Sequence, residues 1–179
     1  MLNIPPKDFT TGIVAENAAA RVTALDPVAR FSLRAHKGDR EAVGSALGLD
    51  LPMRVGQVAG EEMRALCIGP DEWLVHLPEA AADRVREVRI DAPHSLTEIT
   101  DRELSFRIDG PRATELLTLG WPRDPASIAV GEGRRTVFDG ASVILWRDGE
   151  EDWRMDIWRS FAPHVVSLLV TGCTELAAG

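Results

Sequence analysis

The fold is decided by the stretch Trp153-Arg154-Met155-Asp156-Ile157-Trp158-Arg159-Ser160-Phe161-Ala162-Pro163-His164-Val165-Val166-Ser167-Leu168-Leu169, which changes its hydrophobic period within one turn. Trp153, Met155 and Ile157 alternate with Arg154, Asp156 and Trp158, as on a strand with one buried face. Ser160 is placed to cap a following helix, and Pro163 falls in its first turn, where no intrahelical N–H bond is lost. The apolar residues of this helix are Phe161, Val165, Leu168 and Leu169. The stretch predicts a strand, a cap and a helix.

The other face of the predicted strand carries Arg154, Asp156 and Trp158. One interpretation is a solvated outer face with an Arg–Asp pair. The other is a protein contact, because tryptophan and arginine dominate interface hot spots and an indole ring is costly to leave in water. We favour the contact, and take Arg154, Asp156 and Trp158 as candidate partner-contact residues.

Outward from this stretch, the chain shows the same order of predicted strands and helices twice. Alternation at Phe31–Ala35 and at Leu104–Ile108 predicts two half-buried strands. A short helix follows each strand, one ending at Gly48 and the other at Gly120. Further strands are predicted at 53–58, 64–68 and 73–77, and again at 135–138, 141–146 and 153–158, with a hairpin turn at Asp139-Gly140. Helices over 79–88 and 161–170 close the two halves.

The pattern predicts an α+β fold of two pseudo-repeated strand–helix–strands–helix halves, with antiparallel-rich sheets and helices on one side. We expect an N-terminal arm over 1–27, a first half over 28–92, a second half over 93–173 and a tail over 174–179. The segment has weak periodicity and is bracketed by prolines, so we expect an arm rather than part of the core. Such arms can be disordered alone and ordered on a partner.

The composition of the chain argues against several classes of partner and of protein. The 179 residues have a net charge of −8, which argues against nucleic acid and anionic membranes as partners. The start Met1–Pro6 lacks the features of a secretory signal, and no apolar run approaches the ~20 residues of a membrane span. Cys67 and Cys173 form neither a disulfide framework nor a metal-spaced cluster. We expect a soluble, cytoplasmic protein.

Sequence motifs for chemistry are missing. The chain has no glycine-rich phosphate loop and no Gly-x-Ser-x-Gly elbow. Its four histidines are scattered singly, at positions 36, 76, 94 and 164. Asp109, before Gly110-Pro111, reads better as a residue that satisfies the N–H groups of a following helix than as a catalytic carboxylate. We expect no catalytic, cofactor-binding or metal-binding residue.

Three blocks together resemble a known family. They are Leu66-Cys67-Ile68-Gly69-Pro70-Asp71-Glu72-Trp73-Leu74-Val75, then Leu96–Arg102 with Phe106-Arg107-Ile108-Asp109-Gly110-Pro111, then Trp153–Pro163. In order and spacing they resemble the gamma subunit of heterotetrameric sarcosine oxidase, over roughly residues 30–169. The Gly-Pro-Asp-Glu-Trp turn is shared with folate-binding aminomethyltransferase-like domains, so the resemblance implies that fold.

The resemblance also implies a function. It implies a complex that oxidatively demethylates sarcosine to glycine and passes the one-carbon unit to tetrahydrofolate. FAD, FMN, NAD and tetrahydrofolate are then expected on partner subunits, and alpha, beta and delta subunits are the expected partners. The gamma subunit of that family has no assigned catalytic residue, so no site residue is carried over. A related N-methyl amine remains open as the substrate.

Two alternatives stay open. A stand-alone folate-dependent aminomethyl-transfer enzyme would need a pterin pocket with a carboxylate and a proton-transfer residue. A self-associating adaptor of another pathway would pair the same exposed face with a copy of itself, so the isolated chain is also a candidate for self-association.

Overall fold

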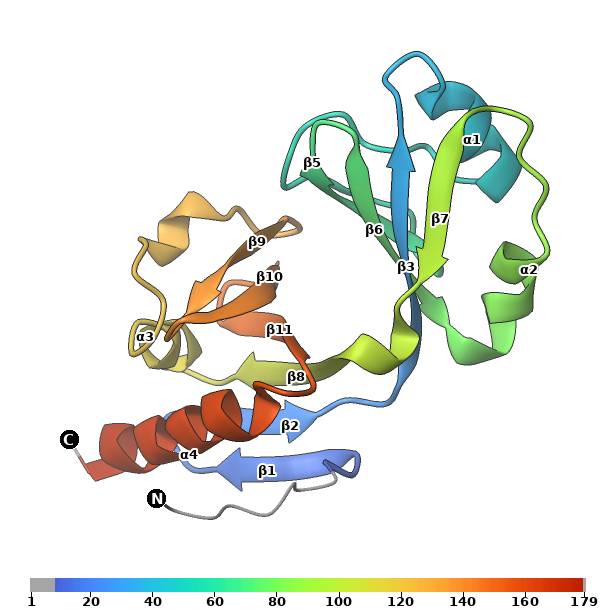
Figure 1. Ribbon diagram of the computed structural model, residues 1–179. Coiled ribbons are helices and arrows are strands. Elements are labelled where there is room, and N and C mark those ends of the chain that lie inside the picture. The colour runs from blue at the N-terminus through green and yellow to red at the C-terminus, as the bar shows by residue number, and fades with distance from the viewer. Residues whose placement is uncertain (1–8, 179) are drawn as a thin grey trace. The chain divides into compact units, whose positions relative to one another are not determined.

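The structure is a computed structural model that describes residues 9–178. Its contacts divide the chain into two compact units. Unit 1 consists of the described residues of Met1–Asp26, Asp101–Gly131 and Arg135–Gly179, and unit 2 consists of Pro27–Thr100 with Glu132–Arg134. Figure 1 shows the helices and strands of each unit.

Unit 2 is built on a five-stranded antiparallel sheet in the order β4-β5-β6-β3-β7. The strands are β3 (Val28–Ala35), β4 (Val58–Ala59), β5 (Arg64–Gly69), β6 (Glu72–Pro78) and β7 (His94–Glu98). Its helices are α1 (Arg40–Leu47), a 3-10 turn (Glu79–Ala81) and α2 (Ala82–Arg86). Phe31, Leu33 and Trp73 of the sheet and Val43 and Val85 of the helices share one buried core.

Local chemistry explains two boundaries in unit 2. Gly48 ends α1 in the left-handed conformation with φ 70°, and its N–H bonds back to the last turn. The Gly-Pro-Asp-Glu-Trp segment forms the turn between β5 and β6, as predicted, and places Trp73 in the core. The Trp73 indole N–H donates to the Pro52 carbonyl at 2.7 Å, so this buried ring keeps its polar atom satisfied.

Unit 1 is built on a six-stranded sheet in the order β1-β2-β8-β11-β10-β9. The strands are β1 (Gly12–Glu16), β2 (Arg21–Ala24), β8 (Glu103–Asp109), β9 (Gly133–Phe138), β10 (Ala141–Gly149) and β11 (Asp152–Trp158). Its helices are α3 (Ala113–Leu117), α4 (Ala162–Ala178) and a 3-10 turn at Pro125–Ser127. A further 3-10 turn, Thr100–Arg102, begins at the last residue of unit 2 and continues into unit 1. Asp139 and Gly140 both have positive φ, 44° and 80°, as the predicted hairpin turn requires.

The core of unit 1 lies between one face of its sheet and the two helices. Trp153, Met155 and Ile157 of β11 are fully buried there with Phe106 of β8 and Leu169 of α4. In Figure 1, α4 runs alongside β1 and β2, which it contacts. The predicted strand 153–158 and its inward-facing residues are therefore confirmed.

The two sheets repeat one topology. The order β4-β5-β6-β3 in unit 2 matches β9-β10-β11-β8 in unit 1, and a fifth strand then pairs with β3 or with β8. That fifth strand is β7 in unit 2 and β2 in unit 1. The predicted α+β fold with pseudo-repeated halves is confirmed.

The expected boundaries differ from the structure in four places. The described part of the N-terminal segment is not an arm, since β1 and β2 extend the sheet of unit 1; residues 1–8 of that prediction lie outside the described residues. Unit 2 extends to Thr100 rather than residue 92, because β7 pairs with β3. Residues 174–178 continue α4 and form no separate tail. The strand predicted at 53–58 is a loop up to the two-residue β4.

Glu98 at the end of β7 gives unit 2 a pH-dependent ion pair. Arg86 donates two hydrogen bonds to it, at 2.9 and 2.7 Å, and with the Thr100 hydroxyl lowers the pKa of Glu98 to about 2. A carboxyl with a lowered pKa stabilises the fold above its ordinary pKa of about 4.3, and this contribution disappears as the pH falls towards the lowered value.

We therefore expect Glu98→Gln to destabilise the protein slightly at neutral pH, because both partners are solvent-exposed. The difference from wild type should shrink below about pH 4.3 and vanish near pH 2. Urea unfolding across this range measures it, with the exposed Glu41→Gln in α1 as control. A Glu98→Gln difference that stays constant down to pH 2 would show that the carboxylate charge is not the cause.

Among residues 9–178, no helix is both long enough and apolar enough to cross a membrane.

Candidate partner-contact site

The three residues proposed for partner contact all lie on β11, on the face opposite the unit 1 core. The strand places them in register with β8 and β10, so their surroundings come from those two neighbours. The structure gives each of them a different environment, and only one is exposed.

Asp156 is not on an exposed surface. Its side chain is 1% exposed and accepts hydrogen bonds from the Ser105 hydroxyl of β8 and, at 2.5 Å, from the Trp146 indole N–H of β10. A buried carboxylate needs such donors to offset the loss of hydration. The expectation that Asp156 faces a partner is thus contradicted, because neighbouring strands occupy its oxygens.

Arg154 is mostly engaged within unit 1. Its guanidinium lies 4.4 Å from the centroid of the Trp146 ring and 3.6 Å from the carboxylate of Asp148. Only 13% of its side chain is exposed. Its stacking on Trp146 holds the guanidinium along the sheet, which leaves little of it for another chain.

Trp158 is the exposed member of the three. It is 41% exposed, and Phe161, 42% exposed, packs beside it at 6.3 Å between ring centroids. The Arg102 guanidinium lies 5.2 Å from the Trp158 ring. We call Arg102, Trp158, Arg159 and Phe161 the aromatic patch. Two adjacent large rings open to solvent are uncommon on a free surface and typical of interfaces.

The Phe161 ring was predicted to point into the core, and this is wrong. α4 begins at Ala162, so Phe161 lies just before the first helical residue. The Phe161 N–H donates to the Trp158 carbonyl at 2.8 Å, closing a tight turn that brings the two rings together. The four-residue spacing of Phe161 and Val165 fits one face of a helix. The sequence pattern therefore did not indicate that Phe161 precedes the first helical residue.

A hollow lies along α4 and includes Ser160, which stands between Arg159 and Phe161 in the chain. Its lining is small or uncharged, and consists of Ser160, Pro163, His164, Ser167, Leu168 and Thr171. At its edge, His164 Nε2 lies 2.7 Å from the Asp139 carboxylate on the β9–β10 turn. Glu175 is the one carboxylate in α4, and the helix has no lysine or arginine. A solvated helix face normally carries more charge than this.

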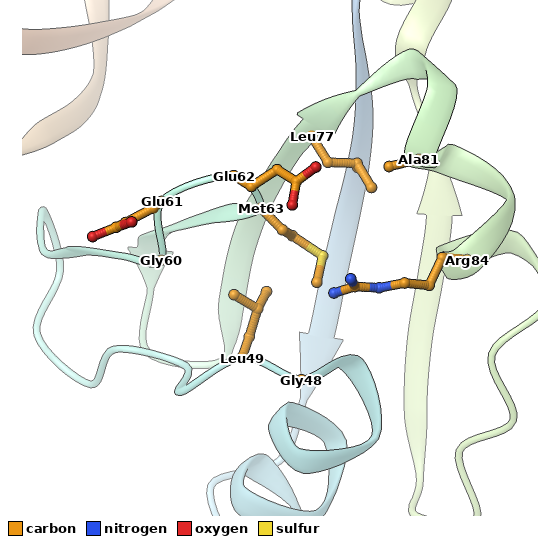
Figure 2. Close-up of a pocket in the computed structure, with 9 residues that line it drawn as sticks. All are labelled: Gly48, Leu49, Gly60, Glu61, Glu62, Met63, Leu77, Ala81 and Arg84. Atoms are coloured by element: carbon orange, nitrogen blue, oxygen red, sulfur yellow. The ribbon is translucent and has the colours of Figure 1, made fainter.

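Unit 2 also contains a hollow, shown in Figure 2. Its floor is apolar and its rim is charged; the lining residues are Gly48, Leu49, Gly60, Glu61, Glu62, Met63, Leu77, Ala81 and Arg84. The Arg84 guanidinium points into it and lies 3.4 Å from the Leu47 carbonyl, at the end of α1. A cation there complements the helix C-terminus, which explains Arg84 without a ligand.

The side chains considered for chemistry have structural partners. Asp109 does not cap α3; it forms a bidentate pair with Arg21, with N–O distances of 2.6 and 3.2 Å. Burial raises the pKa of the Cys67 and Cys173 thiols, which disfavours the reactive thiolate. These residues act in the fold of the described chain.

The family follows from comparison with known proteins. A model of the sarcosine oxidase, gamma subunit family matches residues 34–175. The chain belongs to the sarcosine oxidase gamma subunit family. The resemblance drawn from the three sequence blocks is therefore confirmed. Family relatives include sarcosine oxidase subunit gamma of Corynebacterium sp. (strain U-96), 31% identical over 175 residues that cover 92% of this chain and 85% of that protein. The protein of the same name from Arthrobacter sp is 29% identical, with coverages of 97% and 91%.

Solved structures agree with this gamma-subunit assignment. A chain of heterotetrameric sarcosine oxidase from Corynebacterium sp. U-96, in complex with pyrrole 2-carboxylate, superposes with a TM-score of 0.82 at 28% identity. The match covers 93% of this chain and 90% of that one. Aminomethyltransferase T of the glycine cleavage system from Bartonella henselae matches with a TM-score of 0.65 at 11% identity. This second match shows a shared fold, as predicted.

Proposed function

We propose that this chain is the gamma subunit of a heterotetrameric sarcosine oxidase and serves its assembly rather than its chemistry. The observation that carries this proposal is the superposition on a chain of that heterotetramer over nine-tenths of both chains. The complex oxidatively demethylates sarcosine to glycine and transfers the one-carbon unit to tetrahydrofolate. Alpha, beta and delta subunits are the partners, and they bind FAD, FMN, NAD and tetrahydrofolate.

The distribution of exposed and engaged side chains supports an assembly role. Asp109 and the two thiols are committed to ion pairing or burial, whereas Trp158 and Phe161 are exposed together. Exposed paired rings suit a protein interface. Of the three candidate contact residues, the proposal keeps Trp158 as the main anchor.

A stand-alone aminomethyl-transfer enzyme is less well supported. The aminomethyltransferase match covers 86% of this chain but only 46% of that protein, so more than half of the enzyme has no counterpart in the matched residues. Calorimetric titration of the purified chain with tetrahydrofolate separates the two functions. We expect no heat of binding at micromolar concentrations; micromolar affinity would favour the enzyme.

Affinity purification from the native host tests the assembly proposal. With a tag on this chain, we expect larger polypeptides to co-elute and the eluate to carry a flavin absorption spectrum. Sarcosine-dependent formation of glycine should co-purify with them. Recovery of the tagged chain alone at native expression levels would contradict the proposal.

Trp158→Ala should separate assembly from stability. Because Trp158 lies outside the core, we expect the free energy of unfolding of the isolated chain to change by no more than about 0.5 kcal/mol. Its association with partner subunits should weaken by at least ~2 kcal/mol if the ring is a hot spot. Denaturant unfolding and a binding titration with the purified partners measure the two quantities.

Val137→Ala is the matched control, since Val137 is 45% exposed on β9 of the same unit. It should leave both quantities unchanged. A Trp158→Ala protein that unfolds while its association is intact would mean that the faces of β11 are assigned the wrong way round.

A further inference from the structure

Arg159 stands apart from the other charges around the aromatic patch. Its Nε donates to the Asp101 carbonyl at 3.2 Å, and its backbone N–H donates to the Arg102 carbonyl at 2.8 Å. These two bonds fix the base of an exposed side chain that follows Trp158 in the sequence. Within residues 9–178, no carboxylate lies within ion-pairing distance of it. The adjacent Arg102, by contrast, pairs with Glu103 at 3.0 Å.

An exposed guanidinium that pairs with no internal carboxylate is informative in this chain. The sequence has 28 acidic and 20 basic residues, so acceptors are in excess. Neighbouring arginines of the same sheet, Arg21 and Arg107, each hold a carboxylate in a bidentate pair. Arg159, which follows Trp158 in the chain, instead has an exposed guanidinium. The planar fork of donors on a guanidinium can bind an external carboxylate.

The surface next to Arg159 indicates which side chains a bound segment would have beside its carboxylate. Trp158 and Phe161 offer apolar area, and the hollow lined by Ser160 and residues of α4 has no carboxylate or arginine in its lining. A segment lying there would bury no opposing charge. The surface therefore fits one acidic group followed by apolar side chains, rather than an extended acidic or basic stretch.

We infer that the aromatic patch binds a segment of a partner subunit in which an aspartate or glutamate sits next to an apolar side chain, with Arg159 pairing the carboxylate and the Trp158 and Phe161 rings covering the apolar group. This inference rests on the proposed function and names the chemistry of the contact.

A second copy of this chain fits the aromatic patch less well. A two-fold contact centred on the patch would bring two Arg159 cations together, in chains that already repel through a charge of −8.

Charge reversal tests the role of Arg159 in the complete complex. We expect Arg159→Glu to raise the dissociation constant for the partner subunits by roughly thirty-fold or more, as for a central hot spot. Arg159→Gln should also flatten the dependence of binding on salt concentration, because the screened charge is removed. Arg123→Glu, the same charge change at an exposed site of unit 1, is the matched control and should alter binding less than about threefold.

Photocrosslinking then identifies the occupant. Benzoylphenylalanine in place of Phe161 should crosslink a partner-subunit peptide that contains an aspartate or glutamate near the crosslinked residue. Exchanging that carboxylate for arginine should weaken binding to the wild-type chain and restore binding to Arg159→Glu. Crosslinking to another copy of this chain, a partner peptide without a carboxylate, or unaltered binding by Arg159→Glu would overturn the inference.

The two proposals fail in different ways. If the wild-type chain recovers no partner subunit, the proposed function fails and this inference falls with it. If the wild-type chain recovers its partners and the charge exchange has no effect, only the inference fails.

Discussion

Asp156→Ala is expected to destabilise the isolated chain by about 2–6 kcal/mol, because it leaves two buried donors without their acceptor. Ser105 donates its hydroxyl hydrogen to Asp156, and Trp146 donates its indole N–H at 2.5 Å. Trp146 is fully buried and Ser105 is 7% exposed, so water does not readily replace the carboxylate. For each donor, the loss of this acceptor carries a cost of roughly 1–3 kcal/mol. Urea unfolding of wild type and variant measures the loss.

Asp152→Ala is the matched control for this prediction. Asp152 lies on the same strand and pairs with Arg107 at 2.6 and 2.8 Å, but both side chains are partly solvent-exposed. A surface ion pair contributes about 0–1 kcal/mol, so its loss should cost far less. If the two variants lose similar stability, the hydrogen bonds of the buried Asp156 do not contribute the stability expected of them.

The second large effect is expected at Ile157. Ile157→Ala removes a fully buried aliphatic side chain from the unit 1 core and should cost about 2–5 kcal/mol. The loss combines the transfer of apolar groups to water with the cavity that remains. Denaturant unfolding measures it, and association should be unchanged under conditions where the variant is folded.

Trp158→Ala is the internal comparison for Ile157→Ala, because the two residues are adjacent and point to opposite faces of β11. Trp158→Ala should weaken assembly at nearly constant stability. Ile157→Ala should lower the stability and leave assembly unchanged. Equal losses of stability from both would mean that Trp158 is part of a core in solution.

The strands with a clear two-residue period were predictable from the sequence. β3, β8 and β11 each show one apolar face, and the residues that the alternation selects are buried, apart from the partly buried Leu104. The alternation did not predict the buried polar residues of the other faces, which are Arg30, Glu103, Ser105 and Asp156. The hairpin at Asp139-Gly140 was predictable because both residues tolerate positive φ. The repeat of the two halves followed from this spacing alone.

The missed strands lack that signal. β7 is exposed along most of its length, and β2 has only four residues, so neither shows a readable alternation. Both are held by pairing with a strand distant in the sequence, β3 in one unit and β8 in the other. Such long-range pairing depends on tertiary structure and is not visible in local periodicity.

The candidate site was partly predictable. The sequence placed Trp158 on the outer face correctly, but it gave no sign that Trp146 and Ser105 would enclose Asp156, since Ser105 is 51 residues away. Phe161 was missed as a surface residue because its spacing fits a helix that begins one residue later. The signal that was available is the Trp-Arg-Ser-Phe sequence itself, which places two rings and a cation at the joint of strand and helix.

Native mass spectrometry of the complex purified through this chain tests the central claim most directly. We expect one copy of the chain together with three different polypeptides, and we expect every flavin and folate mass to stay with those polypeptides when this chain is released. A flavin or folate mass carried by this chain, or assemblies that contain only copies of it, would contradict the claim that it serves assembly without a reactive centre.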